Sequence, residues 1–538
     1  MNPSGELSFD YVIVGGGSAG CVLAGRLSED PGVRVALIEA GPDDQSKWVT
    51  IPAGLIGLVP RAMMNWAYQT VPQAALGGRR GYQPRGKVLG GSSSINAMVY
   101  IRGHPADYDE WAQLGCTGWS YADVLPLFRR AEGNAGAVDA RWHGTDGPLK
   151  VSDLRSPSPY NDRFIRAAQA CGHPRNDDFN GERQEGVGLY QVTQGEGERC
   201  NAARAYLAPA LARPNLRVFR NALAQRVVFE GRRARAVTFA EGGSVHRATA
   251  AREVILAAGT FGSPQLLMLS GVGPAAELRA LGIDPVADRA EVGRNLQDHA
   301  DVIVTRRWHD PEHLIGYSWG GLLGLRRQWQ RYQRERRGLL TTNYAESGGF
   351  VATRPGLARP DVQWHFVVAL ADDHGRAKHW GTGYALHACA LRPKSRGTVR
   401  LASPNPAAAP LIDPQFLAHP DDVRTMIAAY RMTQAVLQAA PFADVRGRPL
   451  HPEPAVDDEA AIERFLRERT DTIYHPVGTC RMGPDDDAVV DPALRVRGVD
   501  GLRVVDASIM PRLIGGNTNA PAIMIAEKAV DTIRAQQR

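Results

Sequence analysis

Residues 10–20 read DYVIVGGGSAG, a short apolar run that ends in a glycine-rich turn. The run predicts a buried strand, and the following CVLAGRLSED predicts a helix. After a turn at Pro31–Gly32, the stretch VRVALIEAG predicts a second strand. A strand, a G-x-G-x-x-G turn, a helix and a second strand together predict the start of a Rossmann-like, dinucleotide-binding α/β domain.

Each residue of this motif has a physical role. Gly15 permits the tight turn, Gly17 lets a pyrophosphate approach the backbone, and Gly20 lets helix and strand pack closely. Glu39, at the end of the second strand, is placed to accept hydrogen bonds from adenosine ribose hydroxyls. The motif alone leaves open whether the ligand is a nicotinamide or a flavin dinucleotide.

Length and composition restrict the class of protein. The chain has 538 residues, more than one ordinary core, so two joined domains are expected. A net charge of +6, carried by 63 basic residues of which only six are lysines, is too dilute to predict nucleic-acid binding. The six scattered cysteines predict neither a disulfide framework nor a metal site. Because the sequence shows no signal peptide and no long apolar run, we expect a cytoplasmic protein.

Two further glycine-rich segments favour a flavin. Residues 85–99 read RGKVLGGSSSINAMV, where glycines leave room for a flat ligand and serines and Asn96 offer hydrogen bonds. Residues 253–273 read EVILAAGTFGSPQLLMLSGVG, where a strand ends at Gly259 and Ser263–Pro264 lies in the first turn of a helix.

With these segments and the tail HPVGTCRMG (475–483), the sequence resembles the glucose–methanol–choline (GMC) oxidoreductases from about residue 9 to residue 536. Within that family, NWAYQT (65–70), NYAESGGF (343–350) and LRPKSRG (391–397) resemble bacterial alcohol dehydrogenases on aliphatic substrates and choline dehydrogenases. The resemblance implies an α/β (α+β overall) fold with an FAD-binding domain in three parts and a second, antiparallel-sheet substrate domain. The expected boundaries are 1–155, 196–300 and 471–538 for the FAD-binding domain, 156–195 for a substrate-domain insertion, and 301–470 for the substrate domain.

The resemblance also implies which residues hold FAD. The isoalloxazine is expected near Gly91, Asn96 and Val99, and the adenine near Val227 in the meander ALAQRVVFEGRRARAVTF. The full expected set is Gly15, Gly17, Ser18, Ala19, Gly20, Glu39, Ala40, Trp66, Gly86, Val88, Gly90, Gly91, Ser92, Asn96, Ala97, Met98, Val99, Val227, Ala258, Gly259, Asp506, Ala507, Thr518, Asn519 and Ala520.

Ile95 is a departure from part of the family. Some members attach FAD through a histidine in the loop that here reads GGSSSIN. An aliphatic side chain cannot attack the flavin, so non-covalent FAD is predicted.

His475 and Asn519 are the predicted catalytic residues. Pro476 holds His475 in a shaped loop, and a neutral imidazole can take a hydroxyl proton near neutral pH. Asn519 precedes Pro521 at a predicted helix start, where its amide can orient the alcohol oxygen. The resemblance maps this pair onto the family's catalytic His–Asn pair.

Other polar residues are interpreted more plainly. His299 is expected to anchor a loop, and Cys480 to be a buried, inert thiol. Glu346 and Tyr474 are candidate substrate residues; for Glu346 a structural hydrogen-bond network is an equal alternative.

The predicted reaction is oxidation of a primary alcohol to an aldehyde, with hydride transfer to flavin N5 and electrons passed to a quinone or another acceptor. Choline oxidation, an oxidase using O2, and an FAD-retaining hydroxynitrile lyase remain open as alternatives.

Residues 315–340, IGYSWGGLLGLRRQWQRYQRERRGLL, combine Trp319, Leu322, Leu323 and Leu325 with six arginines and one acid. This pattern is typical of a basic amphipathic helix that rests on an anionic bilayer. A solvated helix, or a lid over the substrate entrance, is the alternative.

Overall fold

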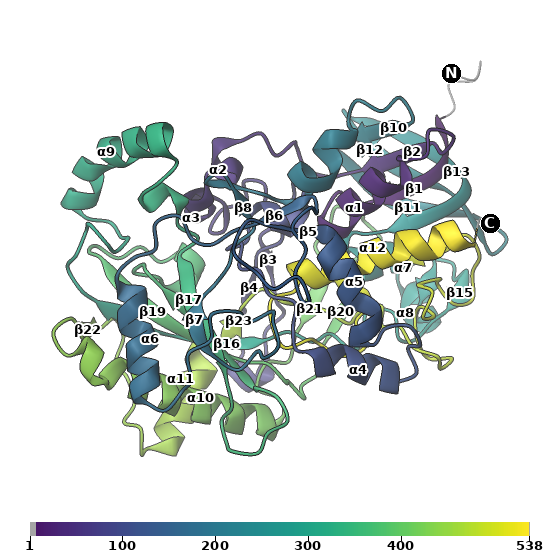
Figure 1. Ribbon diagram of the computed structural model, residues 1–538. Helices are drawn as coiled ribbons and strands as arrows, with labels where there is room; N and C mark the ends of the chain where they lie inside the picture. The colour runs from purple at the N-terminus through teal and green to yellow at the C-terminus, as the bar shows by residue number, and fades with distance from the viewer. Residues whose placement is uncertain (1–6, 537–538) are drawn as a thin grey trace.

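The computed structural model describes residues 7–536, except for the side chains of residues 320, 322 and 323. The chain forms two lobes, each built around a sheet, that lie side by side (Figure 1). The side chains of Leu322 and Leu323, which the sequence analysis counts among the apolar ones of this segment, are outside what the structure describes.

The first sheet has a parallel centre and an antiparallel edge. Its strand order is β10-β2-β1-β13-β12-β11, and β24 pairs in parallel with β13. Its strands are β1 (Leu7–Val14), β2 (Val35–Ile38), β10 (Leu216–Phe219), β11 (Ala222–Glu230), β12 (Arg233–Glu241), β13 (Ser244–Leu256) and β24 (Leu502–Val504). β2 and the end of β1 are buried, as is usual for parallel strands covered on both faces.

The second sheet is antiparallel, in the order β22-β16-β19-β18-β17-β7, with β23 beside β16. At its centre β18 and β19 run antiparallel, with Trp364 opposite Ala388. The strands are β7 (Gly186–Leu189), β16 (Ala300–Arg307), β17 (Ala345–Val351), β18 (Val362–Val367), β19 (Gly383–Ala390), β22 (Arg448–Pro449) and β23 (Asp471–Thr472). We propose that the two sheets are the cores of the two domains expected from the sequence.

Short strand pairs and helices complete the two lobes. The pairs are β3 (Tyr68–Gln69) with β4 (Tyr82–Gln83), β5 (Glu132–Asn134) with β6 (Leu149–Val151), β8 (Gln194–Gly195) with β9 (Glu198–Arg199), β14 (Val272–Gly273) with β15 (Ala287–Asp288), and β20 (Thr398–Arg400) with β21 (Leu411–Asp413). The α-helices are α1 (Ser18–Leu27), α2 (Lys47–Thr50), α3 (Leu55–Leu58), α4 (Pro105–Gln113), α5 (Tyr121–Ala131), α6 (Tyr160–Ala170), α7 (Gly259–Leu269), α8 (Ala275–Ala280), α9 (Trp319–Glu335), α10 (Pro420–Gln438), α11 (Glu459–Arg469) and α12 (Asn519–Ala535).

The helices α1 and α12, near the two ends of the chain, lie together in the first lobe, where α12 packs on α1 and α5 (Figure 1). α1 can lie close to β1 because Gly20 has no side chain; a Cβ there would stand 1.8 Å from the Gly15 carbonyl oxygen. Arg26 of α1 donates through Nε and Nη2 to the buried Glu527 of α12 at 3.1 and 2.9 Å. The first and last helices are therefore joined as one layer over the sheet.

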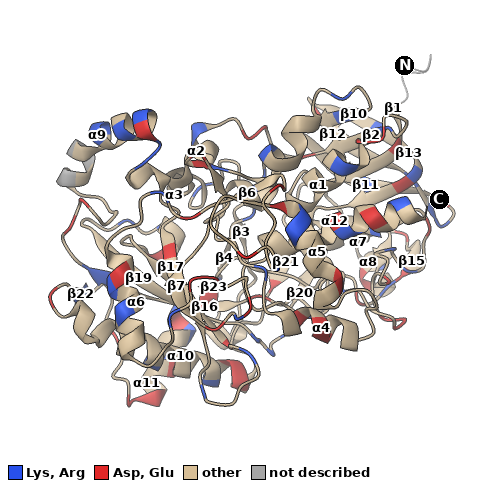
Figure 2. Cartoon of the chain, viewed as in Figure 1, with Lys and Arg blue, Asp and Glu red and all other residues tan. Residues whose placement is uncertain are grey.

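Helix α9 stands apart from the body of the second lobe (Figure 1). Its basic side chains appear as repeated blue bands along the helix in Figure 2. Ser318 caps its start by accepting from the Gly321 N–H at 3.1 Å. Over the described part of the chain, no helix has both the length and the apolar character needed to cross a bilayer.

Candidate active site

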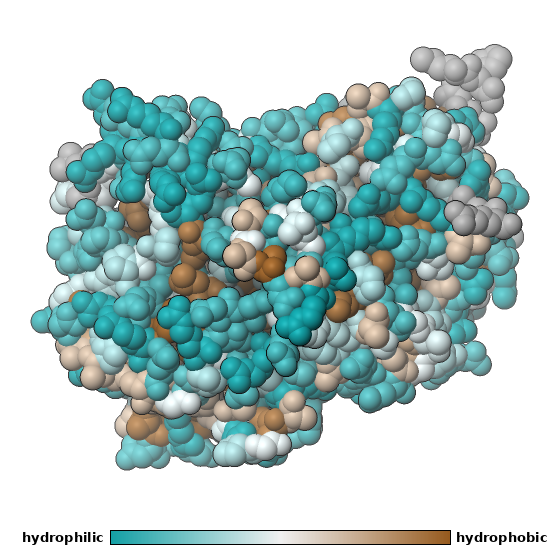
Figure 3. Space-filling model, viewed as in Figure 1, coloured by the Kyte–Doolittle hydropathy of each residue, from teal (hydrophilic) through white to brown (hydrophobic). Residues whose placement is uncertain are grey.

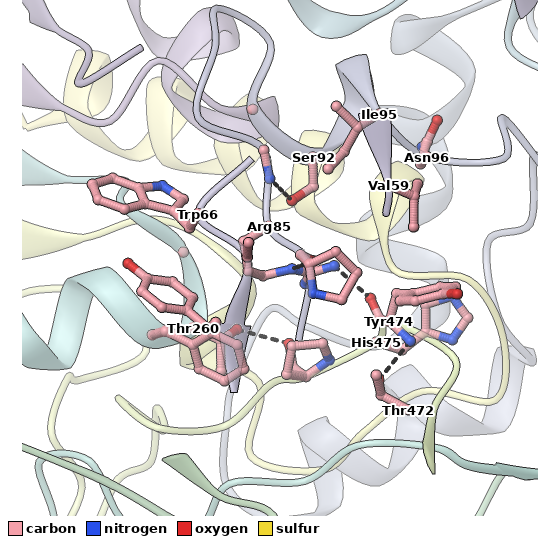
Figure 4. A pocket seen from close by; sticks show the side chains of 18 of the residues that line it. Val59, Trp66, Arg85, Ser92, Ile95, Asn96, Thr260, Thr472, Tyr474 and His475 are labelled. Carbon is pink, nitrogen blue, oxygen red and sulfur yellow. Dashed lines mark hydrogen bonds between the residues drawn. The ribbon is translucent and has the colours of Figure 1, made fainter. Parts of the chain in front are cut away.

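One cavity of about 1170 Å³ is lined by segments from both lobes. Its walls come from the turn after β1, the loop 84–99, the start of α7, the strands β16 and β18, and the residues before α12. Figure 4 shows Trp66, Arg85 and Thr260 on one side of this cavity and Tyr474 and His475 on the other.

Most residues predicted from the sequence lie on this lining. They are Gly15, Gly17, Ser18, Ala19, Glu39, Ala40, Trp66, Gly86, Gly91, Ser92, Asn96, Ala97, Met98, Val99, Ala258, Gly259, Tyr474, His475, Asp506, Ala507, Thr518 and Asn519. Six do not line it: Gly20, Val88, Gly90, Val227, Glu346 and Ala520. Gly20, Val88, Gly90 and Ala520 are the immediate neighbours of lining residues or pack behind them.

The glycine-rich turn offers backbone N–H groups to a ligand. Gly15 has a φ of 99°, which an L side chain rarely adopts, and Gly17 precedes α1 without a side-chain cap. The first N–H groups of α1 are therefore free to bind an anion. Glu39 accepts from the Gly16 and Gly41 N–H groups, each at 2.8 Å, and burial raises its pKa to about 7.

The loop 84–99 crosses the glycine-rich turn at a very short distance. A Cβ on Gly91 would lie 2.6 Å from Gly17 Cα. Arg199, buried behind this loop, donates through Nη1 to the Ser93 carbonyl at 3.1 Å and to the Asn96 carbonyl and Oδ1 at 2.7 Å each. Burial lowers the Arg199 pKa to about 9. The loop is thus held rigidly from behind, with Asn96 facing the cavity.

Two more helices begin at the cavity without a side-chain cap, α7 and α12. At α7 the Asp506 carboxylate takes that place: its Oδ2 accepts from the Gly259 N–H at 2.9 Å and from Ser263 Oγ at 2.5 Å. The uncapped starts of α1 and α12 and the close-packed glycines fit an elongated, anionic dinucleotide such as the FAD that the sequence predicts.

Val227, expected at the adenine, lies outside this lining. Its side chain is buried and its N–H donates to Ser270 Oγ at 2.8 Å. The residues of β11 that line the cavity are the first three of the strand, Ala222, Leu223 and Ala224. Strand β11 pairs antiparallel with β12 and is bulged. The sequence pattern alone therefore does not predict which of its residues line the cavity.

His475 is buried, with both ring nitrogens near polar groups. His299 Nδ1 lies 3.0 Å from its Nδ1, and Asn517 Nδ2 lies 3.1 Å from its Nε2. The backbone N–H of His475 donates to Asp298 Oδ1 at 2.9 Å, and this hydrogen bond fixes the loop. Burial, and then the neighbouring His299 ring and Arg85 guanidinium, lower the His475 pKa well below its usual range. The imidazole is therefore neutral at physiological pH and able to accept a proton.

The amide beside His475 belongs to Asn517, which corrects the expected pairing with Asn519. Asn519 Oδ1 instead accepts from Ser18 Oγ at 2.8 Å, linking the starts of α12 and α1. Both asparagines line the cavity, in the stretch GGNTNAP. Residue 517 precedes the helix and faces the second lobe, whereas residue 519 is its first residue and faces α1.

Two further histidines meet at this point. His299, interpreted from the sequence as a loop anchor, contacts His475 directly, and burial lowers its pKa to about 3. His365 of β18 lines the cavity, and neither ring nitrogen has a hydrogen-bond partner among the described residues. Its place between two aromatic residues in the strand VQWHFV was the available sequence signal.

The two candidate substrate residues differ. Glu346 is tied into a structural network: it accepts from the Ser158 N–H at 2.7 Å, Asn161 Nδ2 at 2.6 Å and Thr342 Oγ1 at 2.5 Å. Burial raises its pKa, and it does not reach the cavity lining. Tyr474 does line the cavity, and its hydroxyl lies 2.7 Å from His374 Nδ1.

Much of the remaining cavity wall is apolar, and Asp301 adds an acidic side chain to it. The apolar lining includes Val59, Ile95, Ile303, Tyr344, Val367, Ala369 and Leu370. Asp301 Oδ2 lies 2.6 Å from His387 Nδ1, whereas its buried Oδ1 has no hydrogen-bond partner among the described residues. Cys480 is buried away from this lining, and burial raises the pKa of its thiol, as expected for an inert cysteine.

Comparison with known proteins gives one family. Residues 9–301 and 393–526 match the N-terminal and C-terminal models described as GMC oxidoreductase. The chain is 49% identical to an alcohol dehydrogenase [acceptor] of Pseudomonas putida, over 98% of this chain and 95% of that protein. It is 44% identical to the human mitochondrial choline dehydrogenase, over 98% and 90%.

Solved structures agree in fold. A pyridoxine 4-oxidase from Mesorbium loti superposes with a TM-score of 0.87 at 33% identity, covering 98% of this chain and 99% of that one. A formate oxidase variant from Aspergillus oryzae superposes with a TM-score of 0.91 at 28% identity, covering 98% of this chain and 98% of that one.

Proposed function

This chain belongs to the GMC oxidoreductase family, and on that premise we propose that it oxidises primary alcohols to aldehydes and passes the electrons to an acceptor other than NAD. The cofactor is FAD. A small-molecule substrate and a separate electron acceptor are in keeping with the alcohol dehydrogenase [acceptor] of Pseudomonas putida, to which the chain is 49% identical.

The observation that carries this proposal is the buried imidazole of His475 at the cavity, with Asn517 Nδ2 3.1 Å from its Nε2. Alcohol oxidation removes a proton from oxygen and a hydride from carbon. His475 Nε2 takes the proton, and Asn517 Nδ2 hydrogen-bonds the alcohol oxygen. FAD, when bound, accepts the hydride together with its two electrons. Arg85, which reaches the Tyr474 carbonyl at 3.0 Å, adds positive charge beside the oxygen that becomes anionic (Figure 4).

Anaerobic mixing with a primary alcohol tests the reaction. We expect hexanol or benzyl alcohol to bleach the flavin absorbance, and His475→Ala to slow bleaching by roughly 10²-fold or more. His246→Ala is a matched control, because His246 lies on the distant hairpin of β12 and β13. Absence of bleaching by every alcohol in the wild type would instead favour a non-redox enzyme such as a hydroxynitrile lyase.

Choline oxidation is the second candidate, and Asp301 is the observation that favours it. Its unpartnered, buried Oδ1 on the cavity wall can accept from, or pair with, a cationic substrate group. Rates of bleaching by choline and hexanol, compared in the wild type and in Asp301→Asn, separate the two. If Asp301→Asn slows bleaching by choline alone, Asp301 pairs with the ammonium group of choline. If hexanol bleaches both proteins at equal rates and choline bleaches neither, choline oxidation is excluded.

For the acceptor, we propose a quinone. Reoxidation of the alcohol-reduced enzyme by a soluble quinone analogue should be faster than by O2. The reverse order identifies an oxidase.

We further propose that the face around α9 rests on an anionic membrane. Trp319 is 71% exposed and packs on the exposed Trp380 at a ring distance of 5.2 Å. Backbone bridges join Ile315 to Ala369 and Tyr317 to Trp380, so this apolar group continues into the cavity wall. Other exposed apolar side chains of this region are Trp48, Ile56, Met63, Tyr317 and Leu325. On the face seen in Figure 3, the outside of α9 is hydrophilic and apolar surface lies in the hollow beneath it.

Basic charge supports an anionic partner for this surface. Arg326, Arg327, Arg331 and Arg334 lie on exposed positions of α9, and Arg331 pairs with Glu335 of the same helix at 3.4 Å. Each basic side chain near an anionic leaflet contributes about 1 kcal/mol. A membrane-bound position brings the cavity entrance close to apolar alcohols and to a membrane quinone.

Cosedimentation with phosphatidylglycerol vesicles tests this surface. Binding should be strong at low salt, weak at high salt, and lost in the pair Trp319→Ser with Arg327→Glu. Val245→Ser, at a 65% exposed position on the first lobe, is the control. If the wild type binds the vesicles at neither low nor high salt, α9 is a solvated helix or a lid instead.

A further inference from the structure

A line of buried hydrogen bonds runs from β18 to His475. Tyr190 OH donates to the Trp364 carbonyl at 2.6 Å. Gln363 Nε2 lies 3.3 Å from Tyr190 OH and 3.0 Å from Asn517 Oδ1. Asn517 Nδ2 then lies 3.1 Å from His475 Nε2. Tyr190, Gln363 and His475 are buried, whereas Asn517 is half-buried at the cavity.

The line has only one self-consistent direction. Because the Tyr190 proton is used on a backbone carbonyl, which can only accept, the Tyr190 oxygen accepts from Gln363 Nε2. The same amide nitrogen donates to Asn517 Oδ1. Asn517 must therefore turn its NH₂ group toward His475, whose Nε2 accepts.

This direction determines the tautomer of His475. With a lone pair on Nε2, the neutral ring carries its proton on Nδ1, and that proton is donated to His299 Nδ1 at 3.0 Å. The nitrogen that faces the cavity beside Asn517 is then the basic one. A reversed Asn517 amide places an acceptor against Nε2, which favours a proton there and blocks the base.

Gln363 also has an unusual position for a glutamine. It lies in the middle of β18, fully buried, between Phe350 and Cys389 on the neighbouring strands. Its Oε1 has no hydrogen-bond partner among the described residues. A buried, half-satisfied amide costs stability relative to an apolar residue, so its retention requires another benefit.

We propose that Gln363 is a positioning residue, which fixes the orientation of the Asn517 amide and thereby keeps the basic nitrogen of His475 directed at the substrate. This rests on the proposed function, since it assigns a role within the same site. Gln363 does not line the cavity and acts only through Asn517.

Several charged or titratable groups face His475 and contribute to its protonation equilibrium. They are Arg85 from the loop 84–99, Asp298 and His299 before β16, His365 from β18, and its neighbour Tyr474. None of them is changed by a substitution at Gln363, so a shift in the pH profile of such a variant reports on the amide and, where the new side chain is a carboxylate, also on its charge.

Gln363→Glu and Gln363→Met test the proposal in the FAD-loaded enzyme. A carboxylate at 363 accepts from Asn517 Nδ2, turns the amide, and stabilises a proton on His475 Nε2. We expect the rate of anaerobic flavin reduction at neutral pH to fall by roughly 10-fold or more. The pH below which this rate declines should move to a higher value. Methionine leaves the amide free to adopt either orientation, so a smaller loss without a comparable displacement is expected.

Nitrogen-15 NMR of histidine-labelled enzyme without substrate gives a readout independent of turnover. In the wild type, the His475 ring should give the signals of the Nδ1–H tautomer. In Gln363→Glu the same ring should change to the Nε2–H tautomer. Gln434→Glu, a buried glutamine beside Arg306, controls for the added carboxylate and should leave both readouts unchanged.

Three results overturn the proposal: an unchanged rate and pH profile in Gln363→Glu, equal losses in both variants that track lost FAD or a lowered melting temperature, or a wild-type His475 protonated on Nε2. If no alcohol bleaches even the wild type, the proposed function fails, whereas the NMR result still decides the role of Gln363.

Discussion

Asn517 and Asn519 lie two positions apart, yet their side chains reach opposite sides of the site. Asn517 contacts the base His475, whereas Asn519 links α12 to α1 through Ser18. A hydrogen bond to a group that becomes charged is worth about 1.5–3 kcal/mol, and one between neutral groups about 1 kcal/mol. The two amides should therefore be separable by experiment.

We predict that Asn517→Ala slows anaerobic flavin reduction by roughly 10- to 100-fold with normal FAD content. Asn519→Ala should keep the reduction rate but release FAD about fivefold more readily, because a neutral hydrogen bond at the α1 terminus is lost. Stopped-flow reduction and FAD dissociation measure the two effects. Exchange of these phenotypes would restore Asn519 as the catalytic amide.

The sequence predicts His475 because its loop and chemistry are local, but it does not predict the partners of the ring. Asn517 and Asn519 both precede the same proline, and a linear pattern does not say which one faces the second lobe. His299 and His365 reach His475 from two strands that are distant in sequence. Their position depends on strand register, which forms only when the sheet is assembled.

At the scale of elements, the crossing of the β1–α1 turn and η3 (Gly91–Ser94) decides whether FAD can be held. Gly91 has a φ of 55° and meets Gly17 through bare backbone. The glycine motif was readable from the sequence, since strand, turn and helix are adjacent. The contact of two glycine-rich segments was not, because nothing in either segment specifies its partner.

We predict that Gly91→Ala lowers FAD occupancy severalfold and lowers the melting temperature. The alanine costs about 1–2 kcal/mol for a left-handed backbone and more for the contact with Gly17. Gly231→Ala is the control: its φ of 57° is similar, but a Cβ there meets nothing within 4 Å. Equal behaviour of the two variants would show that only backbone strain matters at this crossing.

Ile95, directly after η3, carries a prediction about the cofactor bond. Its side chain packs with Val49, Leu58 and Val88 and has no nucleophilic atom. We expect acid precipitation to leave the yellow flavin in the supernatant. Colour retained in the pellet would mean that another residue forms a covalent link.

At the scale of the whole molecule, the two lobes enclose three neutral histidines, His299, His365 and His475. Burial lowers the pKa of each below the value of about 6.5 that histidine has in an unfolded chain. Below that pH the unfolded state binds more protons than the folded state, so the contribution of these groups to stability is lost as the pH falls.

His365 offers a way to measure this linkage. Below pH 6.5, the wild type should lose about 1 kcal/mol of stability per pH unit more than His365→Gln, because the variant has one fewer group to protonate on unfolding. Melting temperatures of both proteins from pH 7.5 to 5.5 should therefore converge or cross on acidification. Parallel curves would show that His365 is protonated in the folded protein.

The central strand β13 lies between β1, near the start of the chain, and β24, near its end, and α12 completes the layer over α1. During synthesis on a ribosome, β1 therefore emerges soon before β2 but long before β13, its neighbour on the other side. The nascent amino-terminal half has to remain unaggregated without its neighbours, and the enzyme can capture its flavin only after the last helix has left the exit tunnel.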